Sequence, residues 1–174
     1  MMRGGHAVLD WGAGARRAAI GPGGIAVKGG EGDGITPRGR WPVRGIFYRA
    51  DRIARPDVTL PLRVIRPDDG WCDAPDDANY NRLVRLPYRA SAEHLWRDDG
   101  LYDLVAVLGF NDDPVVAGKG SAIFLHLARS AGESRSDNSK EPDYSATHGC
   151  VALAFADALV ALEQLRPGDV VIVE

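Results

Sequence analysis

Cysteine is scarce in this chain of 174 residues, which holds only Cys72 and Cys150. Two cysteines allow at most one disulfide bond, so the sequence excludes a disulfide framework and a four-thiolate zinc site. Long apolar runs are also absent, and no stretch approaches the length of a membrane span. No signal peptide is visible at the start of the chain. We therefore expect a soluble protein, although the missing leader says little about its compartment.

Lysine is also rare, since only three of the 21 basic residues are lysine and the rest are arginine. The formal net charge is −3, and basic and acidic residues are interspersed along the chain. Because no basic stripe is present, the sequence favours neither a nucleic-acid partner nor an anionic membrane surface. Arginine can hold carboxylates with two parallel hydrogen bonds, so an acidic substrate is compatible with this composition.

Glycine and proline interrupt the chain throughout, and 45% of the residues are hydrophobic. This spacing favours short strands joined by turns around one sizeable core, and we expect one globular domain. The stretch 36–42, which reads TPRGRWP, is one of these glycine- and proline-containing interruptions. The apolar and alternating runs predict strands at 24–28, 63–66, 82–87, 104–110, 122–128 and 169–174.

One helix is well marked near the C-terminus. Asp157 suits a first helical turn, and Pro167 with Gly168 predicts the stop. Apolar residues recur at helical spacing at Phe155, Ala158, Leu159, Leu162 and Leu165. Before this helix, the polar segment 130–145 predicts an exposed loop that is long enough to act as a flap.

The stretch SATHGCVAL, residues 145–153, concentrates reactive side chains. A thiol becomes a nucleophile as a thiolate, and a nearby imidazole can take its proton, so His126 and His148 are candidate bases for Cys150. Gly149 permits a tight turn that would leave the backbone N–H groups of Gly149 and Cys150 facing an oxyanion. In the strand around His126, a period of two places Phe124 and Ala128 on the face of His126, opposite Ile123, Leu125 and Leu127.

Two plainer interpretations of Cys150 remain open at this point. A free cysteine is most often a small buried hydrophobe, and a histidine in a strand is most often structural. A zinc site made of His126, His148 and Cys150 would need a further ligand or an open position, and the spacing matches no standard zinc pattern. The residues alone therefore leave the nucleophile and the buried thiol in competition and favour zinc least.

Two blocks of this sequence resemble the YkuD-type L,D-transpeptidases. GSAIFLHLAR (120–129) followed by SATHGCVAL is similar to the family signature, in which a histidine precedes a Ser/Thr-His-Gly-Cys block. GEGDGITPRGRWPV (30–43) is similar to an upstream family stretch, and RPDDGWCDAPDDANYNRLVRLPY (66–88) resembles a proteobacterial branch. The resemblance spans a single catalytic domain at 20–174, with 1–19 as an N-terminal extension or first strand.

The resemblance implies a mainly β fold with a few helices, a YkuD-like β-sandwich whose C-terminal helix is followed by a final strand. It implies acyl transfer between peptidoglycan stem peptides with no cofactor and no metal, in the periplasm or cell envelope. Cys150 would form a thioester with the donor stem, His126 would be the general base, His148 would shape the site, and carbapenem-type inhibitors would acylate the thiol. A diaminopimelate amine would then attack the thioester, and the donor residue would be diaminopimelate (3-3 linkage) or L-alanine (1-3 linkage).

Two alternatives to the transpeptidase interpretation remain open. Water in place of the amine would make the protein an L,D-carboxypeptidase that trims stems, and loss of chemistry would leave a peptidoglycan-binding module. The chain also departs from the family pattern, because Ala152 stands where a polar side chain is usual and the loop from His126 to Thr147 is longer than usual.

Stem peptides carry several carboxylates, so we expect arginine, amide and aromatic side chains around the thiol. Arg129 falls on the strand face opposite His126 unless a loop turns it inward, and Trp71 and Tyr80 are alternatively core residues. Cys72 is expected to be a free structural thiol. The candidate substrate-binding residues are Trp71, Tyr80, Asn81, Arg82, Arg129 and Thr147.

Overall fold

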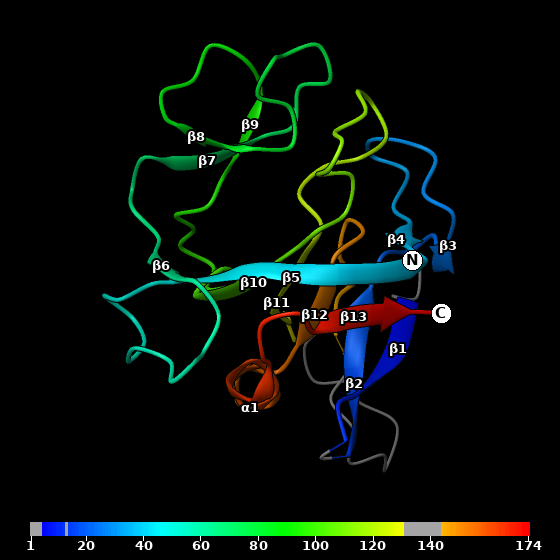
Figure 1. Ribbon diagram of the computed structural model, residues 1–174, viewed down its shortest axis with the longest axis vertical. Coiled ribbons are helices and arrows are strands. Elements are labelled where there is room, and N and C mark those ends of the chain that lie inside the picture. The colour runs from blue at the N-terminus through cyan, green and yellow to red at the C-terminus, as the bar shows by residue number, and fades with distance from the viewer. Residues whose placement is uncertain (1–4, 13, 131–143) are drawn as a thin grey trace.

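The computed structural model describes residues 5–12, 14–130 and 144–174, and its largest unit is an eight-stranded sheet (Figure 1). The strand order is β1-β2-β12-β11-β10-β5-β13, with β6 paired to β5. In this order the strands are β1 Gly5–Asp10, β2 Ala15–Ile20, β12 Val151–Leu153, β11 Phe124–Leu127, β10 Leu104–Leu108, β5 Gly39–Tyr48, β13 Val170–Val173 and β6 Leu62–Val64. The neighbours β11 and β12 are parallel, which brings the His126 strand beside the chain that follows Cys150.

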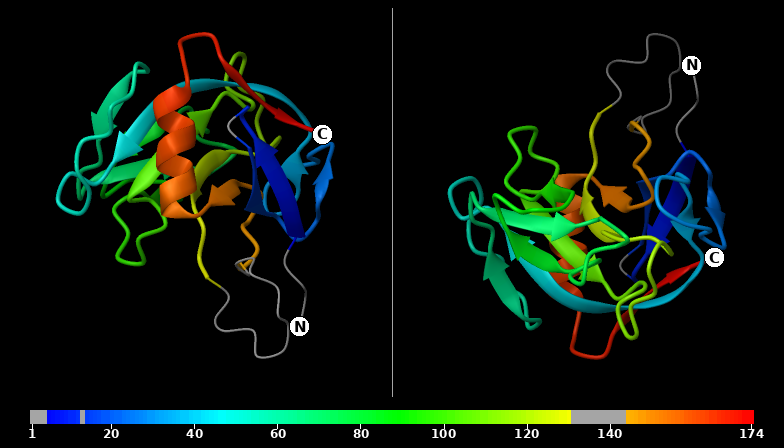
Figure 2. Two further views of the ribbon diagram at one scale, coloured as in Figure 1. Left: turned by 90° about the horizontal axis from the view of Figure 1, so that it is seen from below. Right: turned by 90° about the horizontal axis from the view of Figure 1, so that it is seen from above.

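Two smaller sheets and one helix complete the described fold. The strands β3 Ile25–Ala26 and β4 Thr36–Pro37 form a parallel pair, and β7 Asp69–Cys72 lies between β8 Leu83–Arg85 and β9 Ala92–His94. The helix α1, Phe155–Gln164, packs on β10, β11 and β12 and leads into β13 (Figure 2). No helix among the described residues is long and apolar enough to cross a membrane.

The central strands β10 and β11 are apolar because both of their faces are buried. On one face, Leu125 and Leu127 pack in the cluster that contains Ala158 and Leu162 of α1. On the other face, Phe124 packs in a second cluster with Trp71 of β7 and with Cys150. The predicted alternation around His126 is therefore confirmed, and the helix and the thiol lie on opposite faces of the sheet.

Most of the sequence-based elements are confirmed. Each predicted strand range overlaps a strand, with ends that differ by at most two residues, and α1 begins at Phe155 as expected. The described residues contain one α-helix, near the C-terminus and followed by a final strand, so the mainly β prediction is also confirmed. The predicted flap at 130–145 lies almost wholly in 131–143, outside the described residues.

The glycine- and proline-containing stretch 36–42 is mostly strand, because β4 lies in it and β5, the longest strand of the main sheet, starts there. In β5, Pro42 pairs with Val170 of β13, and the Pro42 carbonyl accepts a hydrogen bond from Gly109 N–H at 2.8 Å. A proline needs no donor of its own at such a position, so a strand can pass through it. The strands β1 and β2 were also not predicted as a pair; they form a hairpin that joins the main sheet where Ala19 pairs with Ala152.

Candidate active site

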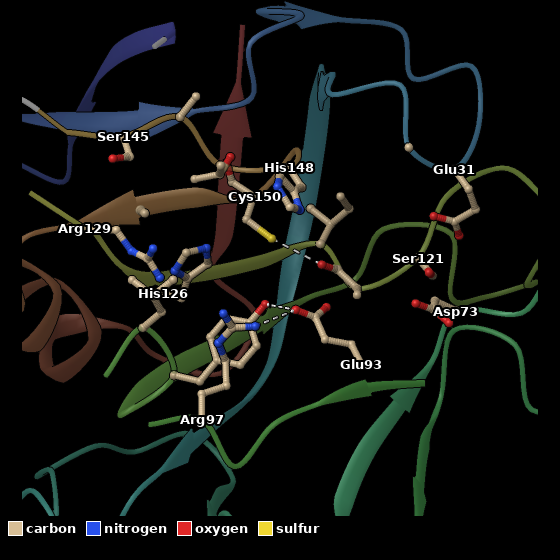
Figure 3. Close-up of a pocket in the computed structure, with 18 of the residues that line it drawn as sticks. Glu31, Asp73, Glu93, Arg97, Ser121, His126, Arg129, Ser145, His148 and Cys150 are labelled. Atoms are coloured by element: carbon tan, nitrogen blue, oxygen red, sulfur yellow. Dashed lines mark hydrogen bonds and ion pairs between the residues drawn. The ribbon is translucent and has the colours of Figure 1, made fainter. Parts of the chain in front are cut away.

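A cavity of about 590 Å³ opens beside the face of the main sheet that carries Cys150. It brings together residues from five separate parts of the chain, around 28–32, 73, 93–102, 121–129 and 145–152 (Figure 3). The sequence-predicted residues that line it are His126, Arg129, Thr147, His148 and Cys150. Ala152, which stands where the family usually has a polar side chain, lines the same cavity.

Cys150 lies directly before β12 and is 7% exposed. Its Sγ accepts a hydrogen bond from Phe124 N–H at 3.4 Å and donates to the Ala122 carbonyl at 3.2 Å. Burial, the largest cause, and the charge of Glu93 together raise the pKa of this thiol to about 12. The resting side chain is therefore a neutral thiol whose proton points to a backbone carbonyl.

His126 sits in the middle of β11 and is buried with its ring edge-on to Tyr102. Its Nδ1 lies 2.9 Å from the Leu127 carbonyl oxygen. A carbonyl only accepts hydrogen bonds, so Nδ1 carries the proton and Nε2 keeps a free lone pair. Burial lowers the pKa of His126 to about 4, which keeps the ring neutral at pH 7. His126 is thus held in the tautomer that can accept a proton at Nε2.

The turn before Cys150 is fixed by Thr147 and Gly149. The Thr147 hydroxyl donates to the Cys150 carbonyl at 2.7 Å and accepts from Gly149 N–H at 3.2 Å. Gly149 has a φ of 132°, and a Cβ there would lie 2.8 Å from the Ile35 carbonyl oxygen. Only glycine fits this position. The Gly149 N–H is already engaged by Thr147, which differs from the expectation that it faces an oxyanion.

Two further sequence-predicted residues lie at the rim. His148 is exposed and lines the cavity. Arg129 lines the cavity as well, on the side of His126, and its Nη2 donates to Asp99 at 2.7 Å while its side chain stays 55% exposed. The chain thus turns after β11 and brings Arg129 to the same cavity as His126.

The other four candidates lie apart from this cavity. Trp71, Asn81 and Arg82 line a separate space of about 380 Å³, and the Tyr80 hydroxyl is held between the Glu31 carboxylate and Gly120 N–H. None of the four is among the described residues that line the Cys150 cavity. The expectation that they surround the thiol is therefore not met.

Asn81 instead joins three segments of the backbone through hydrogen bonds. Its amide nitrogen donates to two backbone carbonyls, of Phe110 and Asn111, and its oxygen accepts from Trp71 Nε1 and from Ala122 N–H. All four hydrogen-bonding positions of the amide are used, so no capacity is left for a substrate. The Ala122 carbonyl accepts the hydrogen bond from the Cys150 thiol, so Asn81, which holds the Ala122 N–H, indirectly positions that thiol.

Sequence reasoning missed the charged residues of the cavity. Lys28 is 3% exposed at its side chain, and its Nζ donates to Asp33 at 2.6 Å and to the Ile35 carbonyl at 3.3 Å. The other missed residues are the charged Glu31, Asp73, Glu93 and Arg97 and the neutral Tyr102. They come from loops and short strands, and nothing in their spacing relates them to Cys150.

The described residues contain no group of three or more His, Cys, Asp and Glu side chains arranged to hold a metal ion. Cys72 and Cys150 are both buried and free. The arrangement that the cavity does provide is a thiol, a neutral imidazole and several charged side chains around one space.

Comparison with known proteins gives one match. Neither the curated proteins nor the solved structures contain a significant match to this chain. The sequence model of the YkuD family, described as the L,D-transpeptidase catalytic domain, matches residues 1–173. Because this match covers almost the whole chain and the cavity holds the cysteine and histidine of the family signature, the chain belongs to the YkuD L,D-transpeptidase catalytic domain family.

Proposed function

We propose that this protein is an L,D-transpeptidase that cross-links peptidoglycan stem peptides through a thioester on Cys150. The family acts on peptidoglycan. The observation that carries the proposal is the position of Cys150 and His126 in one cavity, with Nε2 of His126 free to take a proton. Because the proposed substrate is peptidoglycan, we expect the protein to be located in the periplasm or cell envelope.

The first half-reaction needs the thiol to lose its proton. The Cys150 S–H group donates a hydrogen bond to the Ala122 carbonyl. This bond must break, and the S–H group must rotate, before the proton can pass to His126 Nε2. The sulfur then attacks the donor carbonyl and forms the thioester. His126 returns the proton to the leaving amine, which departs with the C-terminal part of the donor stem.

The second half-reaction runs in the opposite sense. A neutral amine of the acceptor stem attacks the thioester carbonyl, a new amide forms and the Cys150 sulfur leaves. The proton lost by the amine passes to His126 Nε2 and then to the sulfur, which restores the resting thiol. In both steps the Cys150 N–H is the proposed oxyanion donor, because Thr147 occupies the Gly149 N–H.

Burial fits this two-step chemistry. A thiol with a pKa near 12 and an imidazole with a pKa near 4 form a neutral pair at rest, so charge develops only when a carbonyl is there to receive the sulfur. His148, exposed at the rim, shapes the entrance, and Arg129 offers its exposed guanidinium to a substrate carboxylate.

The test is product analysis with purified stem peptides. Cross-linked dimers support the transpeptidase, whereas shortened monomers alone would show that water is the acceptor and that the protein is a carboxypeptidase. The mass that leaves the donor identifies the linkage: loss of the residue after diaminopimelate marks the 3-3 linkage, and loss of everything beyond L-alanine marks the 1-3 linkage. Unchanged peptides would contradict an enzyme on this substrate.

A further inference from the structure

Glu93 is a carboxylate in the wall of the Cys150 cavity, and within the described part of the chain only its Oε1 oxygen is hydrogen-bonded. It lies in β9 and points toward the cavity (Figure 3). The Tyr102 hydroxyl donates to Oε1 at 2.6 Å, and Arg97 Nη1 lies 3.7 Å from the same oxygen. Within the described residues, Oε2 has no hydrogen-bond partner. Among the described residues, Glu93 therefore presents Oε2 as a free carboxylate oxygen.

The nearby arginine does not neutralise Glu93 closely. Arg97 donates from Nε and Nη2 to both oxygens of Asp99, at 3.0 and 2.6 Å, and Asp99 also pairs with Arg129. At 3.7 Å from Glu93, Arg97 makes only a long contact there. The Arg97 guanidinium therefore pairs mainly with Asp99, and the negative charge of Glu93 has no close cationic partner among the described residues.

A second carboxylate adds to that need. Asp73 lines the same cavity, its charge raises the pKa of Glu93, and its buried Oδ1 has no hydrogen-bond partner among the described residues. In Figure 3 the labelled carboxylates Glu31 and Asp73 lie on one side of Glu93, while Arg97, Arg129 and His126 lie on the other. Lys28 also lines the cavity but is paired with Asp33, so it does not compensate the charge of Glu93 directly.

We propose that Glu93 Oε2 binds the primary amine of the acceptor, while Arg129 receives the carboxylate that lies beside that amine. The ligand class is the amine- and carboxylate-bearing end of a diamino acid. This inference rests on the proposed transpeptidase function and assigns the group that selects its acceptor. Glu93 lies outside both signature blocks, whereas Arg129 is the last residue of the first block.

The chemistry of the attack is consistent with a carboxylate at this place. An ammonium group gives one proton to Glu93 Oε2 and becomes the neutral amine that carries a lone pair. Burial is the largest cause that raises the pKa of Glu93, which helps it to take that proton. The amine then attacks the thioester, its next proton passes to His126, and Glu93 releases its own proton to water when the product leaves.

The test is a binding cycle that needs no turnover. The ligand is the stem tripeptide L-Ala-γ-D-Glu-diaminopimelate, either with its free side-chain amine or with that amine acetylated, and Kd is measured by NMR titration. The protein is the wild type, Glu93→Gln, or the control Glu163→Gln, which changes a glutamate on α1. The amide in place of Glu93 still accepts from Tyr102, so the fold is retained.

We expect Glu93→Gln to weaken binding of the free amine about tenfold or more, as for loss of a charged hydrogen bond. Glu93→Gln and the wild type should bind the acetylated peptide equally well. The comparison then isolates the interaction between Glu93 and the free amine. Glu163→Gln should match the wild type with both peptides. A further sign is faster alkylation of Cys150 by iodoacetamide in Glu93→Gln, because the charge that opposes the thiolate is gone.

Two results would overturn the inference: a wild type that binds neither peptide, or a Glu93→Gln variant that binds the free amine as tightly as the wild type. The proposed function fails separately. If the wild type binds the free amine through Glu93 but never forms a thioester, the amine-binding site is supported and the transpeptidase assignment is contradicted.

Discussion

The ring of Tyr102 packs edge-on against the imidazole of His126, with 5.2 Å between the ring centroids, while its hydroxyl donates to Glu93. One tyrosine therefore supports the proposed base with its ring and the proposed amine-binding carboxylate with its hydroxyl. Tyr102 is held beside β11 because the Leu127 N–H donates a hydrogen bond to the carbonyl of the preceding residue, Leu101.

Tyr102→Phe separates these two contacts. The ring that packs on His126 is retained, and the hydrogen bond to Glu93 is lost, so we expect a loss of about 1 kcal/mol in the free energy of unfolding. The acceptor KM should rise more than the rate of acylation falls. Denaturant unfolding and steady-state kinetics with varied acceptor measure the two effects, and an equal fall in both half-reactions would contradict the separation.

His126 predicts a dependence of stability on pH. Its pKa is near 4 in the folded protein and near 6.5 in the unfolded chain, so the unfolded chain binds more protons between these values. The contribution of the neutral imidazole is fully present above pH 6.5 and is lost as pH falls toward 4, by up to about 3 kcal/mol. The wild type should therefore lose stability relative to His126→Gln across this window. Parallel curves of the two proteins would contradict the buried neutral state.

Gly149→Ala should be strongly destabilising, because the backbone there has a positive φ and the new Cβ would meet the Ile35 carbonyl. Gly168→Ala is the matched control, since Gly168 has a φ of 96° but open space around it. The strain common to both costs about 1–3 kcal/mol. Denaturant midpoints should place Gly149→Ala clearly below Gly168→Ala, and equal midpoints would show that the collision with Ile35 is relieved.

Asn81 and Arg82 are adjacent in the chain and should behave differently. Asn81→Ala removes four hydrogen bonds and leaves buried partners such as Trp71 Nε1 unpaired, which we expect to cost at least about 2 kcal/mol. It should also alter the alkylation rate of Cys150 through Ala122. Arg82→Ala changes an exposed side chain and should alter neither quantity. A large activity loss in Arg82→Ala with normal stability would instead place Arg82 at the substrate.

The sequence predicted the parts of the fold that local pattern controls. The strands β10 and β11 and the helix α1 carry apolar residues at the period of their own structure, so their positions could be read directly. The strand β5 could not, because Pro42 and arginines at 40 and 44 interrupt its pattern and its strand conformation depends on partners distant in the chain.

The same distinction holds at the site. Cys150 and His126 belong to two short blocks and were recognisable from sequence, whereas Glu93, Arg97 and Tyr102 reach the cavity only through tertiary packing. Asn81 illustrates the opposite error. A polar residue beside aromatic ones suggested a substrate contact, and the sequence alone cannot distinguish a free amide from one whose four hydrogen bonds are already made within the protein.

The central claim is that Cys150 is the nucleophile, and intact-protein mass spectrometry after incubation with a carbapenem tests it most directly. The account predicts that the wild type and Cys72→Ala gain the mass of one carbapenem, and that Cys150→Ala gains none. An unmodified wild type, or an adduct that persists in Cys150→Ala, would contradict the assignment of Cys150 as the acylated residue.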